Sequence, residues 1–249
     1  MEDYFRELST AESEPGRSER IRWRLSCFDQ GLRYARYIET SYFPLEGAQV
    51  FDAACAWGGH ALALAVLGAR VFAADLNDHA FTALTRLSRQ LELNLWAFQA
   101  SCGSIPLAGR SCDVVLALEL VEHIASVEGF AHEVARVLRP GGICLVSTPA
   151  RIRSFVQGEP HYGIRGLTVL PLSWQRWVAT RLWRRPYPYP IPRQYLRASD
   201  VVEPFASQGL SGLAVIQGRP LKYLQSHARW RRLAEELYWN FIVIKKPDA

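Results

Sequence analysis

Short apolar segments alternate with helical segments over residues 49–148, and this alternation constrains the fold more than any other feature of the sequence. Five runs have the length and apolar character of buried strands: residues 49–54, 70–75, 96–100, 113–118 and 143–148. Helical patterns separate most of them, over residues 60–67, 80–91 and 130–138. Strands that alternate with helices at this spacing form βαβ units and a parallel sheet with both faces covered. The sequence therefore predicts an α/β protein whose ligand site lies at the carboxyl edge of the sheet.

The segments on either side of this core have a different character. Residues 21–42 have a helical pattern, and Pro44 and Gly47 then interrupt it. After Pro149 the chain becomes rich in Trp, Tyr, Pro and Arg and has no clean strand pattern until a helix at 199–208 and strands at 213–217 and 240–244. We expect four parts, which are an N-terminal helical segment, a cofactor-binding α/β core, a substrate-side cap and a C-terminal segment that completes the fold: residues 1–46, 47–150, 151–198 and 199–249.

The turn after the first predicted strand has the features of a nucleoside-cofactor site. It is residues 52–60 (DAACAWGGH), in which a strand ends in the carboxylate of Asp52 and small residues lead into a helix. Small side chains let the backbone approach a ligand, and the helix N-terminus offers free N–H groups. Asp75 closes the next strand, where a carboxylate can accept hydrogen bonds from both ribose hydroxyls.

Two cofactor classes compete for this turn. A dinucleotide site needs the pattern G-x-G-x-x-G so that the pyrophosphate can sit on the helix, but Ala54 and Ala56 occupy positions where glycine would be required. S-adenosylmethionine has no phosphate and tolerates a bulkier turn. The sequence therefore favours a methyl donor over a dinucleotide.

Four motifs together resemble the class I S-adenosylmethionine-dependent methyltransferases. Residues 50–59 (VFDAACAWGG) resemble that family's V-L-D-x-G-C-G-x-G motif, and Asp75 matches its ribose-binding acid. Residues 104–107 (SIPL) and 111–115 (SCDVV) are similar to its "LPF…FDVV" stretch, and residues 136–142 (RVLRPGG) match its "RVLRPGG" signature. The resemblance implies a Rossmann-like, mostly parallel sheet of seven strands with an inserted substrate-side cap.

The same resemblance implies which residues line the cofactor, although the sequence departs from the family pattern at three points. Ala54 and Ala56 replace family glycines, and Ser101 stands where many members have an acid that meets the adenine amino group. Ser101 and the Cys102 backbone are expected to serve there instead. The residues expected to contact S-adenosylmethionine are Asp52, Ala54, Gly58, Asp75, Leu76, Ser101, Cys102 and Leu118.

A motif after the fourth predicted strand suggests a metal. Residues 119–123 (ELVEH) resemble the E-x-x-E-H of ubiquinone-type O-methyltransferases, where these residues bind a divalent cation near the acceptor hydroxyl. On a helical turn, Glu119, Glu122 and His123 would share one face and could hold a hard cation such as Mg²⁺, which lowers the pKa of a hydroxyl. The alternative is that His123 acts as a general base or lines the acceptor pocket without a metal.

His161 is the second candidate base. It lies in residues 159–163 (EPHYG), just after the fifth predicted strand, and a loop histidine between proline and glycine is not typical of core packing. Methyl transfer is an in-line displacement, so the protein must align donor and acceptor, exclude water and remove a proton when the acceptor is oxygen. A histidine that titrates near neutrality suits that last task.

The predicted cap is strongly basic. Residues 151–197 contain nine arginines and a single acid, Glu159, and interleave Trp174, Trp177 and Trp183 with arginine. This composition fits a phosphorylated acceptor or an anionic membrane surface, and equally a helix packed on the core with solvated arginines. Nucleic acid is disfavoured because the "[D/N]PPY" tetrapeptide of amino-methylating DNA enzymes is absent. With no signal-peptide pattern and scattered cysteines, the sequence predicts a cytoplasmic protein, with the membrane surface as the alternative location.

The features combine into one functional hypothesis and one alternative. The hypothesis is a methyltransferase that O-methylates a small or lipid-linked acceptor, a saccharide or phenolic intermediate, with His161 or His123 as the catalytic base. The alternative is a non-catalytic binding or scaffold protein that keeps the methyltransferase fold without using the donor. The sequence does not fix the acceptor or the oligomeric state, because fold does not imply substrate.

Overall fold

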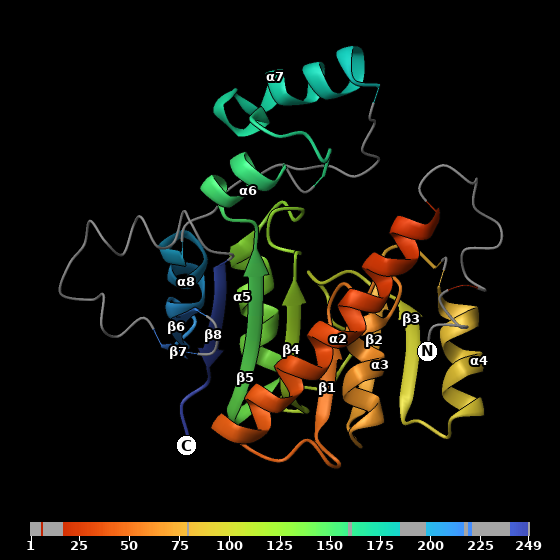
Figure 1. Cartoon of the computed structure of the whole chain (residues 1–249). Helices are drawn as coiled ribbons and strands as arrows, with labels where there is room; N and C mark the ends of the chain where they lie inside the picture. Colours follow the sequence, from red (N-terminus) through yellow and green to blue (C-terminus); the bar gives the residue numbers. More distant parts are fainter. Residues whose placement is uncertain are drawn as a thin grey trace. The chain divides into compact units, whose positions relative to one another are not determined.

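The computed structural model describes residue 6 and residues 17–78, 80–158, 161–184, 198–216, 219–220 and 240–248. It divides into two compact units, of which the first comprises Met1–Leu116 with Arg136–Gly142 and the second Ala117–Ala135 with Ile143–Ala249. Figure 1 labels the helices and strands of the chain. Glu159 and the arginines at positions 185, 193 and 197, which contribute to the predicted basic cap, lie outside the described residues.

The first unit is built on parallel strands in the order β3-β2-β1-β4. These strands are β1 (Gln49–Asp52), β2 (Arg70–Asp75), β3 (Leu95–Gln99) and β4 (Cys112–Leu118), of which β4 continues into the second unit. The register pairs Asp52 with Ala73 on β2 and with Leu116 on β4, and Asp75 pairs with Gln99 on β3. All of these pairs are parallel, so Asp52 and Asp75 close their strands at the same edge.

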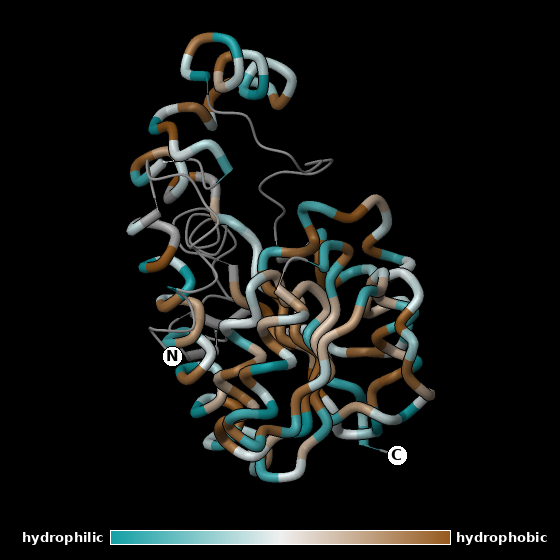
Figure 2. The backbone as a smooth tube through the Cα atoms, turned by 90° about the vertical axis from the view of Figure 1, so that its right-hand side faces the viewer, coloured by the Kyte–Doolittle hydropathy of each residue, from teal (hydrophilic) through white to brown (hydrophobic). Residues whose placement is uncertain are grey.

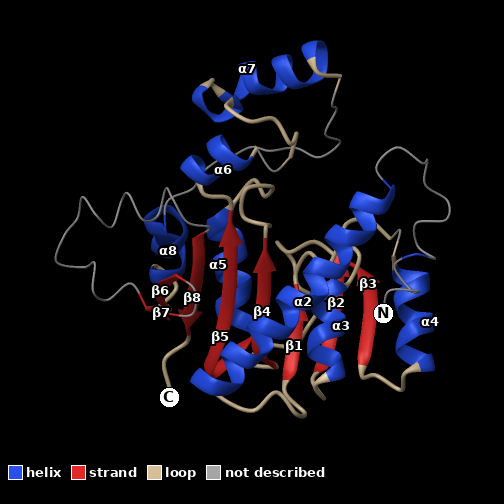
Figure 3. Ribbon diagram, viewed as in Figure 1, coloured by secondary structure: helices blue, strands red, loops and turns tan. Residues whose placement is uncertain are grey.

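Three helices accompany these strands: α2 (Arg17–Ser41), α3 (Gly59–Val66) and α4 (Phe81–Gln90). Helix α3 is apolar almost all round, and α2 packs closely on it and buries part of this apolar surface. Two glycines allow this approach: a Cβ on Gly31 would come within 2.6 Å of the Ala63 Cβ, and one on Gly59 within 2.8 Å of the Cys27 Cβ. Figures 2 and 3 show the hydrophobic strands and the surrounding helices.

The second unit contains most of α5 (Val127–Val137), which ends in the first unit, and most of β5 (Leu138–Thr148), which begins in the first unit. It also contains α8 (Ala198–Ala206), β6 (Ser211–Ile216), β7 (Arg219–Pro220) and β8 (Asn240–Lys245), and its strand order is β5-β8-β6-β7. Since β8 is antiparallel to both β5 and β6, those two strands run in the same direction. The rings of Phe130 on α5 and Phe205 on α8 meet edge to face at 6.0 Å between centroids.

The predicted cap forms a small helical region within this unit. It consists of α6 (Arg151–Gln157), the short helix η1 (Leu167–Val169), α7 (Leu172–Trp177) and η2 (Val178–Leu182). In Figure 1, α7 lies above α6. Tyr162, Ile164, Leu167 and Ala179 are buried together as its own apolar cluster.

The strands and helices expected from the sequence are confirmed with small shifts of their ends. Among the described residues, seven strands have four residues or more, which agrees with the predicted seven-stranded, mostly parallel sheet, and β7 adds a two-residue strand. One difference concerns β5, which begins at Leu138 rather than at Ile143. Gly141 takes a positive φ of 78°, so the RPGG residues of the signature lie inside the strand as a local bend.

Candidate active site

The turn from β1 to α3 is held by backbone hydrogen bonds within the first unit. The Cys55 N–H donates to the Ala74 carbonyl at 2.9 Å, and the Gly58 N–H donates to the Cys55 carbonyl at 2.7 Å. Gly58 precedes α3 with a φ of 75°, a conformation that glycine adopts without a steric cost. Leu84 of α4 fills the space where a Cβ on Gly58 would lie. The turn is therefore fixed by its neighbours on two sides.

The two alanines that replace family glycines differ in conformation. Ala56 has a φ of 46°, in the left-handed region that costs an L-residue roughly 1–2 kcal/mol. Ala54 is absent from the described non-glycine residues with positive φ. A glycine is therefore conformationally useful at position 56 and not at position 54.

The Asp75 carboxylate is tied to this turn. Its Oδ2 accepts a hydrogen bond from the Ala56 N–H at 2.9 Å. Its Oδ1 accepts hydrogen bonds from the Asn77 backbone N–H at 3.0 Å and from the Asn77 side-chain amide at 3.3 Å. A carboxylate has about four acceptor positions, and three are used here, so Asp75 can also accept a hydrogen bond from a ligand hydroxyl.

Asp52 is buried at the end of β1, with 2% of its surface exposed. Its Oδ2 has no hydrogen-bond partner among the described residues. Burial is the main cause that raises the pKa of this carboxyl to about 7; a backbone hydrogen bond from Ala54 opposes the shift, and the nearby Asp75 adds to it. A cationic ligand beside this carboxylate would compensate its charge.

Helix α2 contributes residues to this turn that the sequence did not indicate. The guanidinium of Arg24, which is 2% exposed, lies 3.6 Å from the centre of the Trp57 ring as a cation–π contact. His60 hydrogen-bonds with Gln30 at 3.1 Å and stacks on Tyr34. Burial lowers the pKa of His60 to about 4, so this histidine is neutral at pH 7. Residues of α2 meet the turn and the first residues of α3 through tertiary packing. Such packing leaves no local signature in the sequence.

The remaining predicted cofactor residues lie at the carboxyl ends of strands or on the loops that follow them. Leu76 is 66% exposed after β2, and the Gln99 side-chain amide donates to its carbonyl at 2.6 Å. The Ser101 hydroxyl accepts from the Gly103 N–H at 3.2 Å, so this side chain orders its own loop. Burial raises the pKa of the neighbouring Cys102 thiol. Leu118 is the last residue of β4 and belongs to the second unit, where it is buried.

The RVLRPGG signature has a structural part in the first unit. Arg136 donates to the carbonyls of Leu107 and Ile105 at 2.8 and 2.7 Å. Arg139 pairs with Asp113 at 3.0 Å, and Asp113 in turn accepts from the Gln49 N–H at 2.8 Å. The Arg136 contacts fasten the 105–107 loop to the end of α5, and the Arg139 contacts fasten β4 and β1 to the start of β5.

The ELVEH segment is a turn rather than the helical face expected from the sequence. Glu119 takes a φ of 53°, and its side chain accepts a hydrogen bond from the Ser147 hydroxyl at 2.6 Å. The i, i+3, i+4 relation that would align Glu119 with Glu122 and His123 therefore does not apply. Contrary to the expectation from the sequence, these three side chains do not share one face of a helix.

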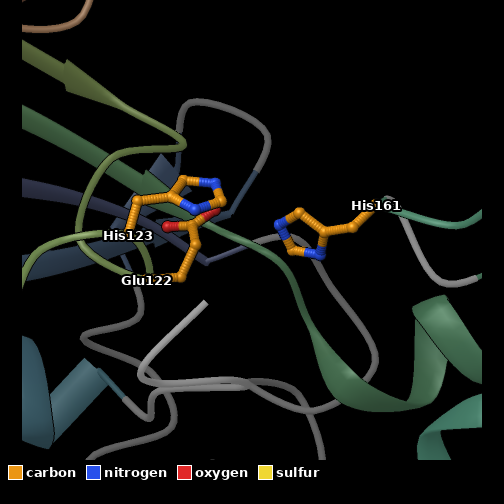
Figure 4. Close-up of side chains that lie close together, drawn as sticks. All are labelled: Glu122, His123 and His161. Atoms are coloured by element: carbon orange, nitrogen blue, oxygen red, sulfur yellow. The ribbon is translucent and has the colours of Figure 1, made fainter. Parts of the chain in front are cut away.

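Glu122, His123 and His161 come together instead (Figure 4). One ligand atom from each lies within 4.8 Å of the other two, and the His123 and His161 rings meet edge to face at 5.1 Å between centroids. Glu122 is buried, whereas both histidines are partly exposed. The two histidines that the sequence proposed as alternative bases are thus neighbours in the second unit.

Known proteins resemble this chain over its core. Residues 51–146 match the family model described as "Methyltransferase domain". A protein named "Ubiquinone biosynthesis O-methyltransferase" from Agrobacterium fabrum is 32% identical over 83% of this chain and 75% of that protein. One of the same name from Methylocella silvestris is 32% identical over 68% of this chain, and the match spans 61% of its length. A solved S-adenosylmethionine dependent methyltransferase from Mesorhizobium loti has a TM-score of 0.56 at 14% identity, over 88% of this chain and 100% of that one.

The chain belongs to the class I S-adenosylmethionine-dependent methyltransferases. The first unit fits the cofactor of this family on two observations. Asp75 keeps acceptor capacity for a ribose hydroxyl, and the buried Asp52 carboxylate with its unpartnered oxygen suits the positive charge that this cofactor carries. In the part of the chain that the structure describes, no helix has the length and apolar character required to span a membrane.

Proposed function

We propose that this protein transfers a methyl group from S-adenosylmethionine to a hydroxyl of a small or lipid-linked acceptor, a saccharide or phenolic intermediate. The names of its relatives support oxygen as the acceptor atom. The observation that carries the proposal is the β1–α3 turn between the carboxylates of Asp52 and Asp75. When bound, S-adenosylmethionine supplies an electrophilic methyl group on a positively charged sulfur.

Each residue of the site has a proposed task. Asp75 binds the ribose hydroxyls, and Asp52 balances the cofactor's positive charge. Ala54, Gly58, Leu76, Ser101, Cys102 and Leu118 line the rest of the cofactor. His161 or His123 takes the proton from the acceptor hydroxyl, because the nitrogen of a partly exposed imidazole beside the Glu122 carboxylate can act as a general base.

Calorimetry with S-adenosylmethionine tests the cofactor site. Asp75→Ala should weaken binding by about 10–100-fold, since a hydrogen bond to a charged group contributes roughly 1.5–3 kcal/mol. Asp78→Ala is the matched control, because this exposed aspartate lies three residues away in the same loop. Absent binding by the wild type, or equal binding by Asp75→Ala, would contradict the proposal. Absent binding would instead support the alternative of a non-catalytic methyltransferase-fold protein.

The cap also supports contact with an anionic membrane. Trp174, Trp177 and Trp183 are 61%, 55% and 52% exposed, and Arg176 and Arg181 are exposed among them. Amphipathic helices with this composition lie in the headgroup region of anionic bilayers. An acceptor with a lipid tail would then be presented to the enzyme at the membrane.

Sedimentation with phosphatidylglycerol vesicles at low salt tests this contact. The double variant Trp174→Ala/Trp177→Ala should lose most of the bound fraction and keep its folding stability, because exposed side chains usually contribute within about 0.5 kcal/mol. Trp96→Ala, which removes a 47% exposed tryptophan from β3, should bind vesicles like the wild type. If wild-type protein remains in the supernatant, the membrane proposal fails while the enzyme proposal stands.

A further inference from the structure

We infer that Glu122, His123 and His161 form a binding site for a borderline divalent metal ion such as Zn²⁺. The three residues come from two separate segments, the turn after β4 and the loop between α6 and η1, and Figure 4 shows the His161 ring beside Glu122 and His123. Their candidate ligand atoms already lie within 4.8 Å of one another. Ligands of a tetrahedral zinc ion are separated by roughly 3.3 Å, given bonds of about 2.0–2.1 Å, so small side-chain rotations would complete the set.

The donor types determine which metal fits. Mg²⁺ prefers an octahedron of oxygen ligands and keeps several waters, whereas imidazole nitrogen suits zinc and its neighbours in the transition series. Two imidazoles and one carboxylate therefore favour Zn²⁺ or Co²⁺ over the Mg²⁺ that a two-glutamate, one-histidine set would favour. A bound dication would also stabilise the charge of the Glu122 carboxylate, which is 1% exposed.

The position of Glu119 separates this site from the set that the ELVEH motif suggested. The Glu119 carboxylate accepts a hydrogen bond from Ser147 at 2.6 Å and lies outside the described cluster. His161 takes its place as the third ligand, so the metal would join the cap to the turn after β4. This makes metal binding dependent on the cap, which a site made only from residues 119–123 would not be.

Three protein ligands leave coordination positions open, as in catalytic zinc sites. An acceptor hydroxyl in an open position would lose its proton more easily, because a metal ion lowers the pKa of a bound oxygen. This last step rests on the proposed O-methylation, but the metal site itself does not. Metal binding can therefore be measured without cofactor or acceptor.

Titration of tag-free, metal-free protein with Zn²⁺ by calorimetry, and with Co²⁺ by visible absorption, tests the inference. The wild type should bind one ion per chain at this site. His161→Gln should weaken Zn²⁺ binding by at least about tenfold, since losing even an outer partner of a metal ligand costs roughly 10–100-fold in affinity. Glu119→Gln should stay within about threefold of the wild type.

His132→Gln is the control for a histidine outside the cluster, because His132 is exposed on α5. Melting temperatures of the metal-free proteins show whether each variant remains folded. Zn²⁺ binding that is unchanged in His161→Gln would overturn the inference. The inference would also be overturned if Mg²⁺ readily displaced Co²⁺ and Glu119→Gln were the variant with weakened metal binding, because Glu119, Glu122 and His123 would then form the site. Failure of cofactor binding with intact metal binding would count only against the proposed function.

Discussion

The candidate cofactor turn and the Glu122–His123–His161 cluster are built in different ways. In the first unit, backbone hydrogen bonds and close packing fix the turn between β1 and α3, so its shape depends on glycine and on buried neighbours. In the second unit, the cluster depends on three side chains from two segments, two of them partly exposed. Substitutions in the turn should therefore change the stability of the fold, whereas substitutions in the cluster and the cap should mainly change binding.

The largest effect is expected at Asp52. Its pKa is about 7 in the folded protein and 3.8 in the unfolded chain. As the pH rises from about 4 to 7, the unfolded chain releases this proton while the folded protein retains it, so stability falls over that window and is constant above it. Asp52→Asn should remove up to roughly 4 kcal/mol of this pH dependence.

Urea unfolding of the wild type and of Asp52→Asn at pH 4.5 and pH 8 measures how the free energy of unfolding of each protein depends on pH. Contributions of the other titratable groups are the same in both proteins and cancel in the difference. Asp78→Asn, which alters an exposed carboxylate, should retain the wild-type dependence. Equal pH dependence in Asp52→Asn and wild type would show that the buried carboxyl is not protonated near pH 7.

The same ionisation predicts that S-adenosylmethionine binds more tightly as the pH rises through 7, because only the charged carboxylate attracts its positive charge.

The next effect is expected at Gly58. An alanine there would take a left-handed φ of 75° and overlap the fully buried Leu84 side chain. Gly58→Ala should destabilise the fold by about 3 kcal/mol, which combines left-handed strain with overpacking. The measurement is the free energy of unfolding in urea.

Gly47 provides a matched control for this prediction. Its φ is 72°, but a Cβ there meets no atom within 4 Å. Gly47→Ala should therefore cost only the strain of about 1 kcal/mol. Similar losses at both positions would mean that contact with Leu84 does not constrain the turn.

The smallest effect distinguishes the two alanines of the turn. Ala56→Gly should stabilise the protein by about 0.5 kcal/mol, because relief of left-handed strain outweighs the extra flexibility of glycine in the unfolded chain. Ala54→Gly should destabilise it by about 0.5–1 kcal/mol, since no strain is relieved there. Thermal unfolding of the two variants should give shifts of opposite sign, and shifts of the same sign would contradict the difference in conformation.

Much of the first unit could be predicted because its information is local. The apolar run over residues 70–75 became β2 with the same ends, and Asp75 closes that strand as expected. The motifs around residues 50–59 and 136–142 identified the family, and the relatives agree with it. The roles of Arg136, which holds the 105–107 loop, and of Arg139, which pairs with Asp113 of β4, were not predictable, since their partners lie on other strands and loops.

In the second unit, the sequence did not predict which side chains come together. A helical spacing was assumed for Glu119, Glu122 and His123, but the positive φ of Glu119 turns its side chain toward Ser147. The sequence named His123 and His161 separately and gave no reason to place them side by side. Likewise, the contact of Arg24 with Trp57 joins a helix to a turn that lies more than thirty residues later.

The sequence by itself determined the alternation of strands and helices, the family and the positions of the two carboxylates proposed to hold the cofactor. These follow from periodicity and from motifs whose residues are close together in the chain. Only the tertiary structure decided that His161, rather than Glu119, joins Glu122 and His123, and that Arg24 lies over Trp57. The physical reason is that contacts between distant segments depend on how whole elements pack, and a single sequence records the residues of such contacts but not their pairing.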